Sequence, residues 1–320
     1  MCRSICARAL ATSVFVLLSV VKGIASNPDP RLLPLIPPNA LLVAGMGAPS
    51  GNSQPDNFLL LTRNNSVDLT DFLGLTGVDP TRLLHQVIFV AAGSAPAGVH
   101  SLLVSGQFDR DRIFKGAVSN GASVTQYRGL PVLVTPPFPR ERGIMNENRW
   151  LVVLQSSVAI FGSEASVREE VDRSLTASMA DISLTRRLER LSPRDDTWCL
   201  VSAVHESDEI RHSLQAFDPS LPGLLHEGDA FQFGIQYGKH VAIEYEVTSA
   251  SPASLRFISD RLSKSFQGSA AENSDVARYL QATEKDGSVR GVVKLSRSRY
   301  EAWLLEVSKR TNDLRSYPNP

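Results

Sequence analysis

One local pattern recurs along this chain and constrains its fold more than any other feature: a β-rich run ends at a polar residue, and an amphipathic helix follows. The run at 99–107 ends before Asp109, and the run at 151–161 ends before Ser163 and Ser166, which are residue types that cap helices. The later runs are 197–204 before Ser207, 240–247 before Ser251 and Pro252, and 288–295 before Ser298. Each helix has one apolar stripe to bury, so the pattern predicts strands covered by helices.

Two of these helix starts match the capping-box spacing. Ser166 is followed by Glu169, and Ser298 is followed by Glu301. In a capping box the first side chain accepts from a backbone N–H, and the second reaches back to the cap residue. We therefore expect helices to begin at Ser166 and Ser298.

Very short links between strand-like runs predict how the strands pair. The linked runs are 230–237 with 240–247 through Gly238-Lys239, and 123–127 with 131–134 through Arg128-Gly129. Neighbouring strands joined by two residues must be antiparallel, because a parallel pair needs a crossover. The expected fold class is α+β, with largely antiparallel sheets and amphipathic helices packed on one face.

The chain divides into segments by composition and by recurrence of the pattern. We expect a signal peptide at 1–25, a Pro-rich extended arm at 26–38, an N-terminal α+β half at 39–194, a C-terminal α+β half at 195–312 and a tail at 313–320. The arm is expected to be extended because proline fixes φ and blocks helix formation. Since the pattern recurs on both sides of residue 195, we also expect a duplicated strand–helix architecture.

Residues 1–25 have the organisation of a secretory signal peptide. Two arginines give a positive start, and Gly23 and Ala25 are small residues at the positions that a signal peptidase inspects. The apolar core, from Ala9 to Val21, is shorter than the roughly 20 residues that a membrane-spanning helix needs. We therefore expect export to a periplasmic or secreted location after cleavage near Ala25, with no stable transmembrane span remaining.

Cleavage there would leave Cys199 as the one cysteine of the mature chain, because Cys2 and Cys6 belong to the leader. A single cysteine cannot form an internal disulfide or a Cys-rich zinc site. Its apolar neighbours, Trp198 and Leu200, predict a buried and inert thiol.

The charge balance is neutral, with 33 basic and 33 acidic residues. Such a balance creates no general field for nucleic acid, so no nucleic-acid partner is expected. The densest basic group is Arg186, Arg187, Arg190 and Arg194, on a predicted helix over 182–191. We expect these arginines to form a solvated helix face, with a site for an anionic partner as the alternative.

His205, Glu209 and His212 are the one set that suggests a metal site. If all three were helical they would share a face and approximate a His-Glu-His set. The HExxH pattern fails, however, because it requires His at position 209, and His205 falls at the end of a strand-like run. Exposed or locally hydrogen-bonded histidines are the favoured alternative, so we expect no metal and no other cofactor.

Motifs for catalysis are incomplete. The glycines within 45–51 miss a dinucleotide fingerprint, since Ser50 stands where a glycine is needed, and a GxSxG pattern fails at Pro55. Glu244 and Glu246 share one face of a predicted strand, and alternation predicts that this face meets solvent. The sequence therefore assigns no catalytic or cofactor-binding residue and favours a non-catalytic protein.

Several phrases occur at strand–helix junctions of the first half. They are LLPLIPPNALLVAGM, FLGLTGVDPTRLLHQVIFVAAG, GQFDRDRIFKGAV, YRGLPVLV and VAIFGSEASVREEVDR. Together they resemble a family of uncharacterised exported bacterial proteins. The resemblance implies an exported α+β protein with no assigned activity, and it transfers no site residue.

We expect an exported, non-catalytic binding or interaction module of the cell envelope or extracellular space, with an envelope protein or a small ligand as its partner. One open alternative is a hydrolase or metal-dependent enzyme without a recognisable motif, in which case a set such as His205, Glu209 and His212 would converge in one pocket. The other is a self-associating structural subunit of the envelope.

Overall fold

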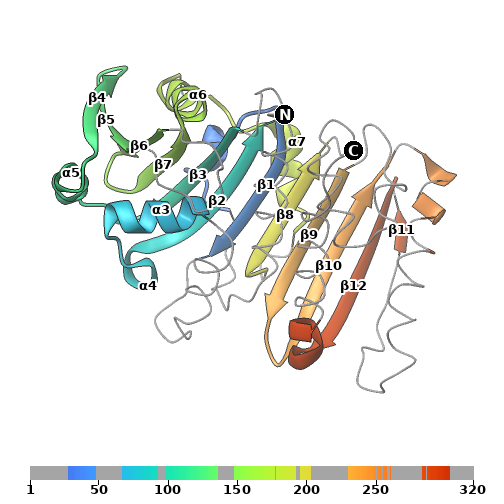
Figure 1. Cartoon of the computed structure of the whole chain (residues 1–320). Coiled ribbons are helices and arrows are strands. Elements are labelled where there is room, and N and C mark those ends of the chain that lie inside the picture. Colours follow the sequence, from blue (N-terminus) through green and yellow to red (C-terminus); the bar gives the residue numbers. More distant parts are fainter. Residues whose placement is uncertain are drawn as a thin grey trace, which may run out of the picture.

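The computed structural model describes residues 28–47, 67–92, 99–135, 148–176, 178–191, 195–202, 230–249, 251–253, 255–257, 260, 283–285 and 287–302. These residues form an α+β protein dominated by one twelve-stranded antiparallel sheet (Figure 1). The strands are β1 (Ala40–Gly47), β2 (Leu84–Ala92), β3 (Val99–Gly106), β4 (Ser123–Tyr127), β5 (Leu130–Thr135), β6 (Arg149–Leu154), β7 (Val158–Ser163), β8 (Thr197–Ser202), β9 (Ala230–Tyr237), β10 (His240–Thr248), β11 (Thr283–Lys285) and β12 (Ser288–Ser296). The helices are η1 (Leu33–Leu35), α3 (Val67–Thr76), α4 (Pro80–Leu83), α5 (Arg110–Ser119), α6 (Glu164–Leu175) and α7 (Ile182–Leu188). The signal peptide expected at 1–25 lies outside the described residues.

The sheet has a seam at its centre, where β1 pairs antiparallel with β8. Its full strand order is β11-β12-β10-β9-β8-β1-β2-β3-β7-β6-β5-β4. Counted outward from the seam, one half runs β1-β2-β3-β7-β6 and the other runs β8-β9-β10-β12-β11. The two halves therefore follow the same order, and the β5-β4 hairpin extends the N-terminal half.

The strand registers also correspond between the halves. The row Ala44, Phe89, Leu102, Phe161 on one side of the seam matches the row Cys199, Phe233, Tyr245, Gly291 on the other. A pseudo-two-fold axis through the seam, perpendicular to the sheet, relates these rows. Such an axis keeps each face of the sheet on its own side.

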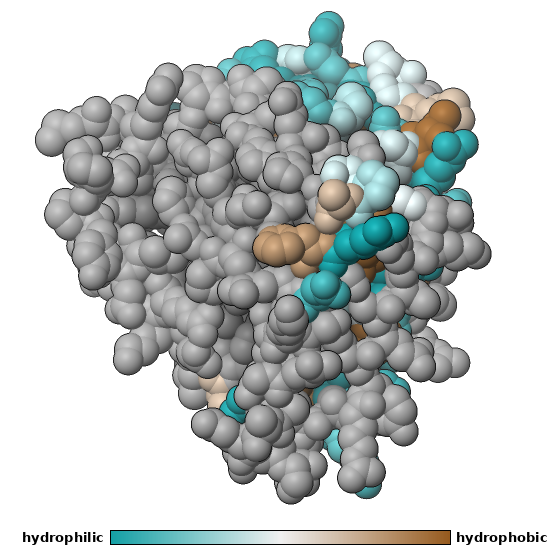
Figure 2. Space-filling view, turned by 90° about the vertical axis from the view of Figure 1, so that its right-hand side faces the viewer, coloured by the Kyte–Doolittle hydropathy of each residue, from teal (hydrophilic) through white to brown (hydrophobic). Residues whose placement is uncertain are grey.

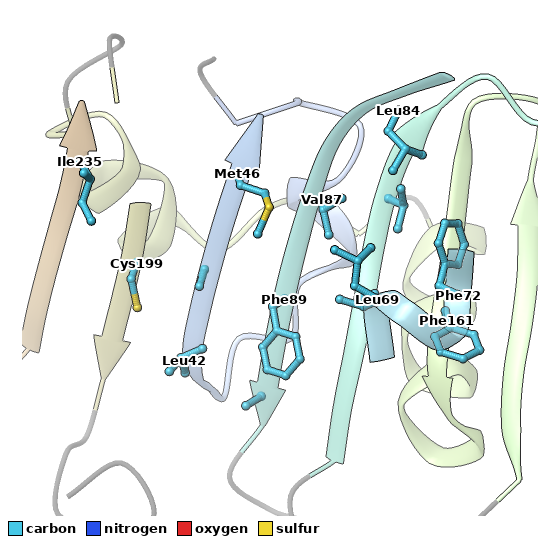
Figure 3. Close-up of a cluster of buried hydrophobic side chains, with 14 of the residues drawn as sticks. Leu42, Met46, Leu69, Phe72, Leu84, Val87, Phe89, Phe161, Cys199 and Ile235 are labelled. Atoms are coloured by element: carbon cyan, nitrogen blue, oxygen red, sulfur yellow. The ribbon is translucent and has the colours of Figure 1, made fainter. Parts of the chain in front are cut away.

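Alternation along the strands separates the buried side chains into two cores on opposite faces. On the first face, α3 and α5 cover the N-terminal half through Leu69, Phe72 and Ile113. Figure 3 shows Phe72 of α3 beside Phe161 of β7, with ring centroids 6.0 Å apart. Interlocking aromatic contacts of this kind fix the position of α3 over the sheet.

On the second face, α6 and α7 cover the sheet through Val167, Val171, Leu184 and Leu188. The expectation that helices pack on one face is therefore wrong. The strands of the N-terminal half explain the difference, since β2 is buried almost continuously instead of alternately. A strand that is apolar on both sides needs a cover on both sides.

The Pro-rich arm packs onto the second face, where Leu32 and Ile36 are fully buried. It is not extended throughout, because η1 forms with Pro34 in its first turn. Proline is compatible with that position, since the first N–H of a helix has no partner within it. Arg173 Nε of α6 donates to Pro34 O at 2.9 Å and ties the arm down.

Helix caps follow the predicted residue types with shifts in position. Asp109 caps α5 as predicted, and its side chain accepts from Arg112 N at 3.0 Å. The cap of α6 is Ser163, which accepts from Ser166 N at 3.2 Å, so Ser166 lies inside the helix. The expected Ser166–Glu169 capping box is wrong for this reason.

The helix after β12 begins earlier than predicted as well. Ser296 accepts from Arg299 N at 3.3 Å, while Glu301 accepts from Arg297 Nε at 3.1 Å. A Ser298–Glu301 capping box would need Glu301 to reach back to Ser298, so that prediction is also wrong.

The predicted hairpins are confirmed, and others that were not predicted are present, β6–β7 and β11–β12 among them. β4 with β5 and β9 with β10 pair antiparallel as expected. Arg128 and Gly129 have φ of 52° and 78°, as a two-residue turn requires. The run at 151–161 is a further hairpin, β6 with β7, whose turn contains Gln155 at φ 54°.

Candidate functional site

The metal candidates His205, Glu209 and His212 lie outside the described residues, so the metal hypothesis stays a prediction. Within the described part of the chain, no group of three or more His, Cys, Asp or Glu side chains is placed to hold a metal ion. That part also contains no helix with the length and apolar character needed to cross a membrane.

A row of polar side chains crosses the second face of the C-terminal half. Gln232 of β9 lies opposite Glu246 of β10, and Glu246 lies opposite Arg290 of β12. Gln232 and Glu246 are buried, whereas the Arg290 side chain is 52% exposed. We call these three residues the polar row.

The pseudo-two-fold axis gives the polar row a counterpart in the N-terminal half. The residues at the corresponding register positions are Ile88, Leu103 and Ile160, all fully buried. They belong to the apolar core that α6 covers. The same three positions thus hold an apolar row in one half and the polar row in the other.

Glu246 is the centre of the polar row. Its Oε2 accepts from Gln232 Nε2 at 2.7 Å, and its Oε1 accepts from Arg190 Nη1 at 3.2 Å. Arg290 Nε lies 3.1 Å from the same Oε1. The Glu246 side chain is 5% exposed, so its predicted position in solvent is wrong: two long arginines cover it, and cross-strand partners replace water.

Arg187 anchors α7 to the strands beside the polar row. Its Nη2 donates to Val201 O at 3.0 Å and to Phe231 O at 3.1 Å, while its Nε donates to Gln232 Oε1 at 3.3 Å. Burial lowers the pKa of this guanidinium, and Glu246 acts in the opposite direction. Arg187 is therefore a fixed structural cation. Arg186 and Arg190 are exposed, as expected for a solvated arginine face, and Arg194 lies outside the described residues, so Arg187 is the exception on this helix.

Two buried acidic residues, Asp195 and Asp196, lie just before β8 near the seam. The carboxylate of Asp195 lies against Gly234, in the space that any side chain at that position would need. Asp196 Oδ2 accepts from Tyr237 N at 2.6 Å, and burial raises the pKa of Asp196 to about 6. Both carboxyl groups are buried, so neither is an accessible charge of the second face.

The accessible charges of this face are mostly cations. Arg190 has a side-chain exposure of 45%, Arg290 and Lys294 are exposed, and Glu244 is partly exposed. Figure 2 looks onto the C-terminal edge of the sheet and shows hydrophilic residues beside a few hydrophobic ones there. We call the three residues of the polar row, together with Arg190, Glu244 and Lys294, the polar surface. It offers charge-assisted hydrogen bonds to a partner with acidic groups.

Ser101 and Glu170 are the nearest approach to a catalytic pair on the described residues. The Ser101 hydroxyl donates to Glu170 Oε1, and burial raises the pKa of Glu170 to about 8. A carboxyl with such a pKa is a candidate general base. Ser101 of β3 is 3% exposed, however, and Glu170 of α6 is 1% exposed, so a substrate has no access to them.

Cys199 is buried in β8 at the seam, as predicted from its apolar neighbours. Burial raises the pKa of its thiol to about 12. The thiolate is the nucleophilic form, so this cysteine is inert in the folded chain.

No protein-family model and no curated protein matches this chain. Among solved structures, the chain is similar to TP0453 in crystal form I, with a TM-score of 0.50 and 8% identity over 88% of this chain and 97% of that one. Crystal form III of TP0453 matches with a TM-score of 0.49 and 11% identity over 87% of this chain and 98% of that one. At this level of identity the likeness to crystal form I concerns the fold alone: a large antiparallel sheet with helices.

Proposed function

We propose that this chain is an exported, non-catalytic binding protein of the cell envelope, belonging to a family of uncharacterised exported bacterial proteins, and that its polar surface contacts the partner. We further propose that its two halves are copies of one strand–helix unit. The matching strand orders and registers on the two sides of the seam support this duplication.

The observation that carries the proposal is the difference between the halves at one row. Ile88, Leu103 and Ile160 supply apolar burial, whereas the polar row brings a carboxylate and a guanidinium to the same three positions. Only the carboxylate of this pair is buried, since Arg290 is 52% exposed, and an ion pair that takes a carboxylate out of water adds little stability compared with packed apolar side chains of similar size. Selection for stability alone would therefore favour a second apolar row, and the polar one indicates a use for the charge.

The chemistry of the polar surface suggests the class of partner. Arg190, Arg290 and Lys294 are accessible, and Glu244 is their partly exposed acidic neighbour. A sheet face with this balance of charges suits an acidic patch on another protein better than a small ligand, which needs an enclosing pocket. We therefore assign the surface to an envelope protein with an acidic contact patch.

The test is affinity capture from envelope extract, with the full-length chain expressed in its own export pathway and tagged at the C-terminus. Wild type is compared with a charge-reversal variant, Arg290→Glu with Lys294→Glu, and captured proteins are quantified by mass spectrometry. The matched control reverses two exposed cations of α5, Arg110→Glu with Lys115→Glu. Each variant is checked by circular dichroism for the wild-type spectrum.

We expect a stoichiometric protein that the polar-surface variant loses and the α5 control retains. Its capture should also weaken as salt is raised, because exposed charges are screened. A companion that binds both variants equally would show that the polar surface is not the contact. An empty wild-type capture, or one in which only a small molecule is enriched, would overturn the proposal.

A further inference from the structure

Strand β4 forms one outer edge of the sheet. It ends the strand order, and β5 is its one partner strand within the described part of the chain. Ser123, Val124, Thr125 and Gln126 are all exposed, and Val124 is exposed to 52%. The edge of β4 is therefore available to another strand.

This edge lacks the devices that natural sheets use against strand addition. Such edges usually carry charged residues, proline or a β-bulge. The β4 sequence SVTQY contains no charge and no proline, and it pairs with β5 without a break in register. A regular, uncharged strand of this kind is a ready template for further pairing.

The hairpin geometry identifies the free backbone groups. In a two-residue hairpin the flanking residues, Tyr127 and Leu130, form a hydrogen-bonded pair, and bonded and non-bonded pairs then alternate. Gln126 consequently faces Pro131 at a non-bonded position, which is consistent with the missing N–H of Pro131. Val124 and Gln126 thus direct their backbone N–H and C=O groups outward from the sheet.

We propose that β4 pairs antiparallel with β4 of a second copy of this chain, about a two-fold axis at Thr125. In that register Val124 of each chain lies opposite Gln126 of the other, so their outward groups exchange both N–H···O bonds. The two Thr125 side chains meet at a non-bonded pair, a favourable combination in sheets. The interface is isologous, as closed dimers require, and it repeats the antiparallel strand pairing of the seam.

The charges beside β4 agree with self-pairing. Arg128, which follows the strand, would lie opposite Ala122 of the other copy, so no like charges face each other. Its Nε also donates to Asp172 Oδ1 of α6 at 2.9 Å, which compensates its charge within its own chain. The strand is therefore self-complementary in both hydrogen bonding and charge.

Sedimentation equilibrium of the full-length protein over a wide range of concentration tests the proposal. Wild type is compared with two variants. Thr125→Lys places two positive charges opposite each other at the two-fold axis, and Gln126→Pro removes a backbone N–H that points outward. The control is Ile182→Lys on α7, which also adds a lysine and removes a side chain that is 68% exposed. Unchanged circular dichroism spectra verify that each variant is folded.

We expect wild type to form a dimer. The Kd of this dimer should be roughly tenfold or more higher in each β4 variant, because Gln126→Pro removes two interchain hydrogen bonds and Thr125→Lys places two lysines opposite each other. The Ile182→Lys control should dimerise as wild type does. A wild type that is monomeric at every concentration contradicts the proposal. So does a dimer that only Ile182→Lys dissociates, because association would then use the apolar side chains of the α6–α7 region.

Cysteine cross-linking tests the register independently of partner capture. In a background with Cys2→Ser and Cys6→Ser, Thr125→Cys should form an intermolecular disulfide on mild oxidation, because position 125 faces itself. Val124→Cys is the matched control and should cross-link far less, because position 124 faces Gln126. Efficient cross-linking through Val124→Cys alone would exclude a Thr125 axis. This proposal does not depend on the polar surface, so the two can fail separately.

Discussion

The indole ring of Trp198 lies against the bare Cα of Gly45, across the seam where β1 and β8 pair. A Cβ at position 45 would overlap the ring atoms. Trp198 is 2% exposed and belongs to the core of the second face, so the ring has no room to withdraw. The close approach at the middle of the sheet therefore depends on a glycine at this position.

Replacing Gly45 by alanine should destabilise the fold by about 1–3 kcal/mol, the usual cost of an overpacked core. Urea denaturation monitored by circular dichroism measures this loss. Gly74→Ala in α3 is the matched control, because a Cβ there meets no atom within 4 Å. The control should gain about 0.4–1 kcal/mol through lower entropy of the unfolded chain. Equal effects at both positions would show that the Trp198 contact is not limiting.

Glu170 should make stability depend on pH between about 4.5 and 8. Burial raises the pKa of this carboxyl from its ordinary 4.5 to about 8, so the folded state keeps a proton that the unfolded state loses. The contribution of Glu170 to stability is therefore greatest below pH 4.5 and is lost as pH rises to about 8, by an amount on the order of a few kcal/mol. Glu170→Gln cannot ionise and should remove this decline in urea titrations at several pH values.

Glu169→Gln supplies the comparison for Glu170. Glu169 is the next residue on α6 and is exposed, so its replacement should leave the pH dependence nearly unchanged. If Glu170→Gln followed the wild-type profile, the carboxyl would be ionised in the folded chain and the burial argument would be refuted.

Arg187→Ala should destabilise the protein by about 2–4 kcal/mol, because it leaves Val201 O, Phe231 O and Gln232 Oε1 without this donor. Thermal unfolding by differential scanning fluorimetry detects the change. The adjacent Arg186 is exposed, and Arg186→Ala should stay within about 0.5 kcal/mol of wild type. A loss of the same size in both variants would indicate a helix effect instead of an anchoring effect.

Thiol labelling tests the leader and the buried cysteine together. Cys199 is buried with a raised thiol pKa of about 12, so it should not react with a disulfide reagent in the folded protein. After denaturation, a chain cleaved near Ala25 should show one reactive thiol, whereas an uncleaved chain should show three. Intact mass spectrometry of the protein purified from cells shows directly whether the proposed leader is removed and where.

The sequence predicted strands and hairpins well because their causes are local. Alternating β-rich runs and two-residue links at Gly238-Lys239 and Arg128-Gly129 determine pairing without reference to distant residues. The β6–β7 hairpin was missed because Gln155 begins a polar turn inside a run that otherwise reads as one strand. The sequence did not predict that helices cover both faces of the sheet. The apolar stripe of a helix shows that the helix packs against the sheet, but it does not show which face of the sheet the helix covers.

The spacing of residues on α7 could have predicted the burial of Arg187. Leu184, Leu188 and Leu191 form the apolar stripe, and Arg187, three residues after Leu184, falls on that same side of the helix. This spacing predicts a buried guanidinium. The shielding of Glu246 had no such local sign, since it depends on Gln232, a cross-strand partner 14 residues away, and on Arg190 just after α7, 56 residues away.

The seam also governs the order in which the chain can fold. β1 is the first strand among the described residues, and its partner β8 begins more than 150 residues after the start of β1, at Thr197. Because contacts between distant residues form slowly, the N-terminal half can assemble while one side of β1 remains open. An open strand is where unfinished chains aggregate. If the chain emerges N-terminus first, a holding chaperone would therefore act most usefully at β1, until β8 emerges and closes the sheet.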